Sequence, residues 1–185
     1  MTRPISKNVD YFPHYIRKTP ELKLIMHNHK SEGYMAYYKL LELVADAEYH
    51  YLSVKTEDEK NMFALGMEKC DMEVVYDVIR ILCNSGHINK EIWKNHKVIW
   101  MEDFVKKFRG VWYKRGKTLP KIDSNGKVYR GVSMAWPNKK KAPEDYFIPL
   151  IHPITGKECV MPSRGWRNPS KTMKRLLKAK LILFG

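Results

Sequence analysis

Apolar residues recur at helical spacing through the first half of the chain. Residues 31–50 carry a stripe that repeats every three or four positions, formed by Tyr34, Tyr38, Leu41 and Ala45 and widened by Leu40, Leu43 and Val44. A second stripe runs through residues 71–85 and consists of Val74, Val75, Val78, Ile79 and Leu82. Because apolar residues with this period line one face of an α-helix, both segments are predicted to be core helices.

Several residues at the ends of these segments fit helix boundaries. Thr19-Pro20-Glu21 combines a hydroxyl N-cap with a proline and an acid in the first turn. Ser31-Glu32 opens the long stripe, and Thr56 precedes the acidic first turn of a further helix that ends at Gly66. Asp71 is the expected N-cap of the second striped helix. The first half is therefore predicted to contain three or four helices.

Two short β-prone runs follow Gly86 in the sequence HINKEIWKNHKVIWM. We expect them to pair as a hairpin around Lys94-Asn95-His96-Lys97. Helices followed by a two-stranded ribbon form the outline of a winged helix-turn-helix. The expected fold class is α+β, mainly α, with a winged helix-turn-helix-like domain over residues 1–117.

The second half of the chain is less periodic. Residues 118–127 hold the turn-forming sequence Asp123-Ser124-Asn125-Gly126 and are expected to be a linker. Residues 128–185 are rich in proline, and a turn is expected at Ile154-Thr155-Gly156-Lys157. One helix is expected to begin at Ser170. This stretch is thus predicted to be a small, irregular basic segment with one helix.

The printed sequence closes on the apolar run Leu181-Ile182-Leu183-Phe184-Gly185. Loose termini are usually polar and poorly ordered. We therefore expect either that this run docks as a strand or that the polypeptide is cut from a longer protein.

The formal net charge is +14, and it is unevenly distributed. Residues 1–103 contain 14 Lys and Arg against 16 Asp and Glu, whereas residues 104–185 contain 20 against 4. A concentrated positive charge favours polyanionic partners through long-range attraction and counterion release. DNA is the expected partner, and a solvated basic tail with a solubility role is the alternative.

The expected contacts to DNA lie in this second half. They are Lys106, Lys107, Lys114, Arg115, Lys139, Lys140, Lys141, Arg164, Trp166, Arg167, Lys171, Lys174, Arg175 and Lys178. Trp112 and Tyr113 are further candidates, because aromatic side chains stack on unpaired bases. For Trp112, packing against the helical domain is the alternative.

The helix predicted over residues 71–85 is poorly suited to reading DNA bases. Recognition helices usually present Arg, Lys, Asn or Gln to the major groove. This helix instead exposes Asp71, Glu73 and Asp77. Arg80 is its only base, so the face should repel phosphate. We therefore favour an oligomerisation or docking module for the first domain, with direct reading of the DNA groove as the alternative.

Other classes of site and location are disfavoured by the sequence. No run of eighteen apolar residues is present, so no membrane span is expected, and the start MTRPISKNVDYFPHY lacks the apolar region of a signal peptide. Cys70, Cys83 and Cys159 are few and widely spaced, which suits a reducing cytoplasm. His27 and His29 would point to opposite sides of a helix, so we expect no metal site. We also expect no cofactor and no catalytic residue.

The segment VDYFPHYIRKTPELKLIMHNHKSEGYMAYYKLLELV resembles the amino-terminal domain of many phage and mobile-element replication proteins. The shared features are a Tyr-Phe-Pro-His opening at residues 11–14 and a Glu-Gly-Tyr step at residues 32–34. Those proteins are related to the winged-helix domain of DnaD-type primosome components. The resemblance covers about residues 6–117 and implies DNA handling or protein assembly without catalysis.

A second segment, HPITGKECVMPSRGWRNPSKTMKRLLKAKLILFG, is similar to part of type III restriction-modification DNA adenine methyltransferases. The matching residues are Pro153, Thr155, Gly156, Lys157, Pro162, Arg164, Gly165, Trp166, Arg167, Met173, Leu176, Leu177, Ile182, Phe184 and Gly185. The resemblance covers about residues 128–185. In those enzymes the segment lies between two blocks of catalytic motifs, on the side associated with target DNA. Their Asp-Pro-Pro-Tyr and Phe-x-Gly-x-Gly motifs are absent here, so the resemblance implies no methylation by this chain alone.

Three functional hypotheses follow. The first is a non-catalytic DNA-binding and assembly protein of phage or mobile-element origin, located in the cytoplasm. Its expected partners are DNA and either a second copy of itself or a methyltransferase or replication protein; no membrane partner is expected. The second is a fragment or subunit of a type III DNA adenine methyltransferase that needs a partner chain for catalysis. The third is an interaction protein that interferes with restriction-modification.

Overall fold

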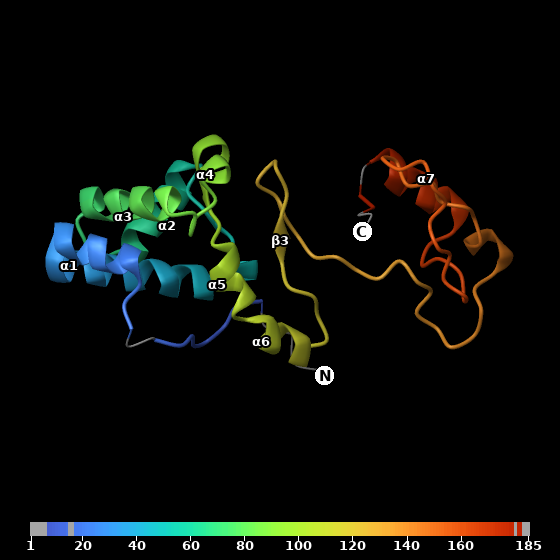
Figure 1. The fold of residues 1–185 in the computed structure, drawn as a ribbon, viewed down its shortest axis with the longest axis horizontal. Helices are drawn as coiled ribbons and strands as arrows, with labels where there is room; N and C mark the ends of the chain where they lie inside the picture. The colour runs from blue at the N-terminus through green and yellow to red at the C-terminus, as the bar shows by residue number, and fades with distance from the viewer. Residues whose placement is uncertain (1–6, 15–16, 180, 183–185) are drawn as a thin grey trace. The chain divides into compact units, whose positions relative to one another are not determined.

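A computed structural model describes residues 7–14, 17–179 and 181–182 of the chain (Figure 1). The chain divides into two compact units, which we call unit 1 (residues 1–130) and unit 2 (residues 131–185). Unit 1 holds most of the helices, whereas unit 2 is formed largely by loops around one helix.

Helix α1 (Pro20–Asp46) is kinked rather than continuous. Its N-cap is Thr19, whose Oγ1 accepts a hydrogen bond from the Leu22 N–H at 3.3 Å. The helix breaks at Lys30, where φ is 55° and ψ is −131°, and its second part starts at Ser31. The two predicted helical segments are therefore confirmed as the two parts of one kinked element.

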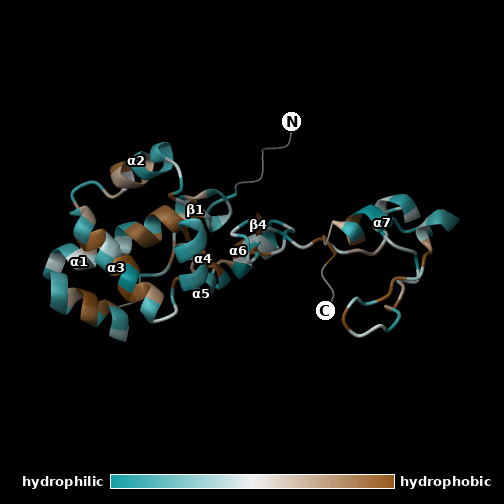
Figure 2. Ribbon diagram, turned by 90° about the horizontal axis from the view of Figure 1, so that it is seen from above, coloured by the Kyte–Doolittle hydropathy of each residue, from teal (hydrophilic) through white to brown (hydrophobic). Residues whose placement is uncertain are grey.

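Helices α2 (Glu57–Gly66) and α3 (Met72–Asn84) also begin where their capping residues predict. Thr56 forms a capping box at the start of α2. The Asp71 carboxylate accepts a hydrogen bond from the Glu73 N–H, 2.8 Å away, at the start of α3. α3 packs against α1, and Figure 2 shows hydrophobic stretches on both helices. These two helices form the centre of the unit 1 core.

The hairpin predicted over residues 87–101 is wrong. Its first run forms helix α4 (Lys90–His96) instead of a strand. The Asn89 Oδ1 accepts a hydrogen bond from the Ile92 N–H at 3.0 Å and so caps the helix. Lys97 ends the helix in the left-handed conformation, with φ at 53°. The cap and the terminating residue outweigh the β-propensity of the residues between them.

The run after α4 does form a strand, β2 (Val98–Ile99). It pairs antiparallel with β1 (Leu52–Ser53), which follows α1 and the short 3-10 helix η1 (Glu48–His50). The pair therefore joins distant parts of the chain and is not the predicted hairpin of two neighbouring runs. The winged helix-turn-helix is not confirmed and stays a prediction.

The segment that follows β2 forms two short helices, α5 (Glu102–Lys106) and α6 (Arg109–Lys114). Phe104, Phe108 and Trp112 are buried in the unit 1 core. For Trp112, the alternative of packing against the helical domain is therefore confirmed.

A small hairpin closes unit 1. It consists of β3 (Lys121–Ile122) and β4 (Val128–Tyr129), which pair antiparallel. The turn includes Asp123, whose backbone carbonyl accepts a hydrogen bond from the Gly126 N–H at 3.1 Å. The range 118–127, expected to be a linker, thus contains the first strand and the turn of this hairpin.

Unit 2 contains the 3-10 helix η2 (Glu144–Tyr146) and helix α7 (Ser170–Lys178). The helix begins at the predicted residue. The turn predicted near Thr155 is also confirmed, because the Gly156 N–H donates a hydrogen bond to the His152 carbonyl at 2.9 Å.

The core of unit 2 is small. It consists of Leu150, Trp166, Met173 and Ile182 among the described residues. In the apolar run near the end of the printed sequence, Leu181 is exposed and Ile182 is buried. Neither is part of a strand. The remaining residues of that run, 183–185, lie outside the described part of the chain.

The described chain is therefore mainly helical with small antiparallel strand pairs, which agrees with the expected α+β, mainly α, class. Among the helices that the structure describes, none combines the length and the apolar composition needed to cross a membrane.

Candidate nucleic-acid interface

Helix α7 presents a basic face to solvent. Met173 is buried beneath the helix, and Leu176 and Leu177 pack against the same core. The opposite face is exposed and carries Lys171, Lys174, Arg175 and Lys178. In the part of the chain that the structure describes, no carboxylate pairs with these four side chains. Figure 2 accordingly draws α7 mainly in the colour of hydrophilic residues.

The remainder of unit 2 adds to this positive charge. Unit 2 contains eleven Lys and Arg residues against three acids, Glu144, Asp145 and Glu158. The excess is therefore eight positive charges on 55 residues. Such a density produces a potential that attracts polyanions from a distance.

Two groups of predicted contact residues meet at one place in unit 2. The Arg164 guanidinium donates a hydrogen bond to the Asn138 carbonyl at 2.9 Å. The Ala142 N–H donates to the Arg164 carbonyl at 3.0 Å. These two bonds hold the exposed Lys139–Lys141 loop against Arg164, so sequence-distant cations share one surface. Arg167 is also exposed.

Trp166 differs from its predicted role as an exposed DNA contact. It is buried in the unit 2 core. Its indole N–H donates a hydrogen bond to the Ile148 carbonyl at 2.7 Å. We therefore regard Trp166 as a core residue that holds Arg164 and Arg167 in place on the surface.

The predicted contacts in unit 1 have protein partners. Lys106 lies 3.0 Å from Asp103 and 3.1 Å from Glu102, and these hydrogen bonds raise the pKa of its ammonium group. The Arg115 guanidinium donates to the Asn8 carbonyl at 2.7 Å. Both side chains are therefore held by local partners.

The other aromatic and basic candidates near α6 differ in their contacts and in their exposure to solvent. The Lys107 ammonium lies 5.9 Å from the Phe104 ring centroid. Lys114 is exposed, and Tyr113 is exposed over 82% of its surface. Tyr113 thus stays available for stacking on a base, whereas the buried Trp112 does not.

Of the three acids expected to be exposed on α3, Asp71 and Glu73 are exposed, whereas Asp77 is half-buried. The Asp77 carboxylate contacts His29 Nε2 at 2.8 Å and accepts a hydrogen bond from Arg80 Nε at 2.7 Å. The hydrogen bond with His29, followed by that with Arg80, lowers the pKa of Asp77. Asp77 therefore stabilises the contact between α1 and α3.

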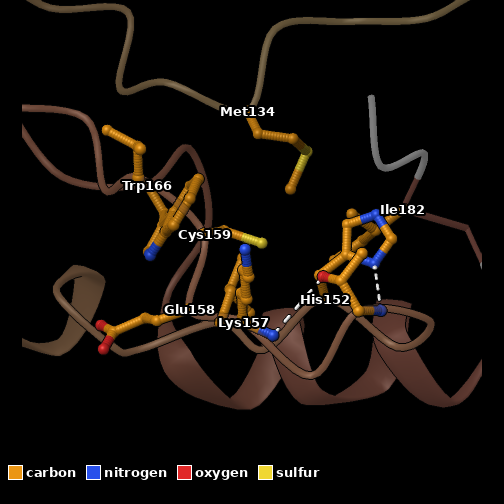
Figure 3. Close-up of a pocket in the computed structure, with 10 residues that line it drawn as sticks. Met134, His152, Lys157, Glu158, Cys159, Trp166 and Ile182 are labelled. Carbon is orange, nitrogen blue, oxygen red and sulfur yellow. Dashed lines mark hydrogen bonds between the residues drawn. The ribbon is translucent and has the colours of Figure 1, made fainter.

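A pocket of about 380 Å³ opens into the core of unit 2 (Figure 3). Leu150, Trp166 and Ile182 contribute apolar walls, and Met134 and Cys159 reach into the space between Trp166 and His152. The rim is polar and includes Thr155, Lys157 and Glu158. Chemically, such a pocket suits a flat apolar group attached to a polar or charged one.

His152 is fixed at the edge of this pocket by its own turn. Its Nδ1 accepts hydrogen bonds from the Ile154 and Thr155 N–H groups, each at 3.2 Å. The imidazole proton is therefore on Nε2. Over the described residues, no cluster of three metal-ligating side chains exists, so the pocket carries no candidate metal site.

Sequence reasoning missed this pocket because its walls come from four separate stretches. No common motif or period links these stretches, which are residue 134, residues 150–160, residue 166 and residue 182. One signal was present, since residues 150–166 contain apolar residues without helical or strand periodicity.

The chain is similar to one curated protein, the type III restriction-modification enzyme EcoP15I Mod subunit of Escherichia coli. The identity is 29% over 153 residues, which cover 75% of this chain and 20% of that protein. The chain thus spans about a fifth of the length of this relative. The similarity also extends well beyond the expected residues 128–185 and includes much of unit 1. No solved structure matches the chain.

The first half has a clear family assignment. The family model described as Lin1244/Lin1753-like, N-terminal, matches residues 11–104, which is half of the chain. The match begins at the Tyr-Phe-Pro-His motif and ends within α5. The expected relation to DnaD-type winged-helix domains is not shown. The chain belongs to the family of Lin1244/Lin1753-like N-terminal domains.

Proposed function

We propose that this chain is a non-catalytic nucleic-acid-binding protein. Unit 2 binds the phosphate backbone of DNA, and unit 1 provides protein–protein assembly. The observation that carries the proposal is the exposed basic face of α7 on a unit with eleven cations and three acids.

The energetic basis is the release of counterions from DNA. Each phosphate that a lysine or arginine neutralises contributes roughly 0.9 units to the slope of log affinity against log salt on duplex DNA. The side chains of α7 suit this role because they have no carboxylate partner in the described chain. Their charge is therefore not already neutralised, in contrast to that of Lys106.

The test is a salt titration of binding to a fluorescein-labelled DNA duplex. One variant replaces Lys171, Lys174, Arg175 and Lys178 by glutamine. The matched control replaces four exposed lysines of unit 1 by glutamine, namely Lys23, Lys55, Lys90 and Lys94. Both variants lose the same net charge, so a difference between them reports the position of the charge.

We expect the α7 variant to lower the salt slope by about three to four units and the control to lower it much less. An equal decrease of the salt slope in the two variants would mean that DNA binding depends on the net charge and not on its position. That result, or an affinity that hardly changes with salt, would contradict a binding face on α7.

The similarity to the Mod subunit supports a second candidate function. In it, the chain completes a DNA adenine methyltransferase whose catalytic motifs are on another polypeptide. The test measures transfer of a labelled methyl group from S-adenosylmethionine to DNA, with the chain alone and with the product of the neighbouring reading frame. Activity only in the mixture would favour this candidate, and no activity in either would remove it.

A further inference from the structure

Unit 1 contains a groove of about 620 Å³ that the DNA-binding proposal does not use. Its walls come from the segment before α1 and from the second part of α1. Tyr11 and His14, from the Tyr-Phe-Pro-His motif, line it together with Tyr34 and Tyr38. The two motifs that mark this chain at the sequence level thus meet in one place.

The aromatic rings of the groove are held in fixed positions. The His14 imidazole stacks on the Tyr38 ring, with centroids 4.1 Å apart and planes 14° apart. The Tyr34 hydroxyl is hydrogen-bonded to His14 Nε2 at 2.8 Å. The Tyr34 and Tyr38 ring centroids are 4.8 Å apart. Tyr11 stands at the edge and is exposed over 79% of its surface.

Besides His14 and the tyrosines, the polar residues that line the groove are acids. Asp10, Glu42 and Asp46 line it, and all three are exposed. Of the described residues that line it, none is a lysine or an arginine. The groove is thus a local negative site on a chain whose formal net charge is +14.

Aromatic rings combined with carboxylates favour a cationic ligand. The negative face of an aromatic ring attracts an ammonium or guanidinium group, and a nearby carboxylate adds to this attraction. The chain itself provides an example, because the Lys18 ammonium lies 5.8 Å from the Tyr34 ring centroid. An apolar ligand would remove the three carboxylates from water, and the Asn8 side-chain amide, which donates to Asp46 Oδ1 at 2.8 Å, compensates Asp46 alone among the contacts described. A polyanion would be repelled.

We propose that this groove binds an arginine- or lysine-bearing segment of a partner protein. The volume of the groove exceeds that of one side chain, so it receives a short stretch of polypeptide and not a lone cation. The inference names the partner chemistry for the assembly role that we propose for unit 1. It does not depend on DNA binding by unit 2, which the salt titration tests separately.

The test uses the whole chain and two fluorescein-labelled peptides. One peptide is Gly-Arg-Lys-Arg-Gly and the other is its neutral counterpart Gly-Gln-Gln-Gln-Gly. Fluorescence anisotropy measures the affinity for each. Because the net charge of the chain repels cations, binding of the cationic peptide requires a local acidic site.

Variants then locate the site. We expect Tyr11→Ala and Glu42→Gln each to weaken binding of the cationic peptide by about fivefold. The matched controls are Tyr113→Ala, an equally exposed tyrosine outside the groove, and Glu57→Gln on α2. Neither control should change the affinity.

Three results would overturn the proposal. The first is no binding of the cationic peptide, and the second is equal binding of the neutral one. The third is a loss of affinity for the cationic peptide in Tyr11→Ala that is no larger than the loss in Tyr113→Ala. All four substituted residues are exposed or lie outside the core, so loss of folding would not explain these results.

Discussion

At the scale of single residues, His50 is the buried histidine of unit 1, and its hydrogen bonds fix it in the neutral form. Its Nδ1–H donates to the Val44 and Ala45 carbonyls, at 3.3 Å and 3.2 Å. Its Nε2 accepts the Trp112 indole N–H at 3.1 Å. Both ring nitrogens are therefore engaged, and protonation of Nε2 would break the bond with Trp112. Burial accordingly lowers the pKa of His50 below its ordinary value of 6.5.

This lowered pKa makes the stability of unit 1 depend on pH. The stabilisation from His50 is complete above the unfolded pKa of 6.5 and is lost as the pH falls toward the folded pKa. We expect His50→Gln to lower the free energy of unfolding by about 1–3 kcal/mol at neutral pH. The variant should also lose less stability than the wild type as the pH falls from about 7 to 5.

Urea unfolding at both pH values checks this expectation. His27→Gln is the matched control for the substitution itself, since His27 is exposed and lies outside the core. A wild-type pH dependence in His50→Gln would show that another group causes it.

The residues of the candidate interface differ in how far the sequence alone could predict their exposure. The exposed cations of α7 were predictable, because Met173, Leu176 and Leu177 determine which face of the helix is buried. The burial of Trp166 was not, because its hydrogen-bond acceptor is the carbonyl of Ile148, 18 positions away. The charge of the α7 side chains follows from the sequence itself. The burial of Trp166 depends on contacts with distant residues, which the sequence does not show.

At the scale of secondary-structure elements, the β3–β4 hairpin approaches α4 at a glycine. Gly126 has a φ of +69°, and an added Cβ would lie 2.9 Å from the Cβ and Cγ of His96. Gly116, at the end of α6, has a similar φ of +64° but has no other group within 4 Å of that position. Both positions therefore have a left-handed backbone that would strain a residue with a side chain, and they differ in crowding.

Alanine at each glycine separates these two effects. We expect Gly116→Ala to cost about 1 kcal/mol, the strain of the left-handed conformation. Gly126→Ala should cost about 2–4 kcal/mol, because the methyl group also pushes against α4. Thermal or urea unfolding measures the difference, and equal costs would show that the hairpin does not rest on α4.

Elements with strong local caps were also those predictable from sequence. Thr19, Thr56 and Asp71 each cap a helix with a side-chain hydrogen bond, and all three starts were predicted correctly. Asn89 caps α4 in the same way, yet β-prone residues after it suggested a strand. The pairing of β1 with β2 could not be predicted, since it joins Leu52 to Ile99 and Ser53 to Val98, which are 47 and 45 positions apart.

At the scale of the whole molecule, the two units differ in the size of their cores. Among the described residues, unit 2 buries four hydrophobic side chains in its core, whereas unit 1 buries a cluster several times larger. Because burial of apolar surface is the main stabilising term, unit 2 should open more readily than unit 1. Its apolar pocket further reduces the packing of its core.

Hydrogen–deuterium exchange of the whole chain should resolve this difference. We expect the amides of α7 to exchange faster than those of α3.

Duplex DNA should then slow exchange in α7, because a ligand that binds the folded unit stabilises it by about 2.7 kcal/mol at a hundredfold excess over Kd. That shift corresponds to roughly hundredfold slower exchange at amides that open with unit 2. The α3 amides should not change, since the proposed contacts lie in unit 2. Protection of α3 in place of α7 would move the DNA contact to unit 1, and equal exchange in the two helices without DNA would contradict the weaker core of unit 2.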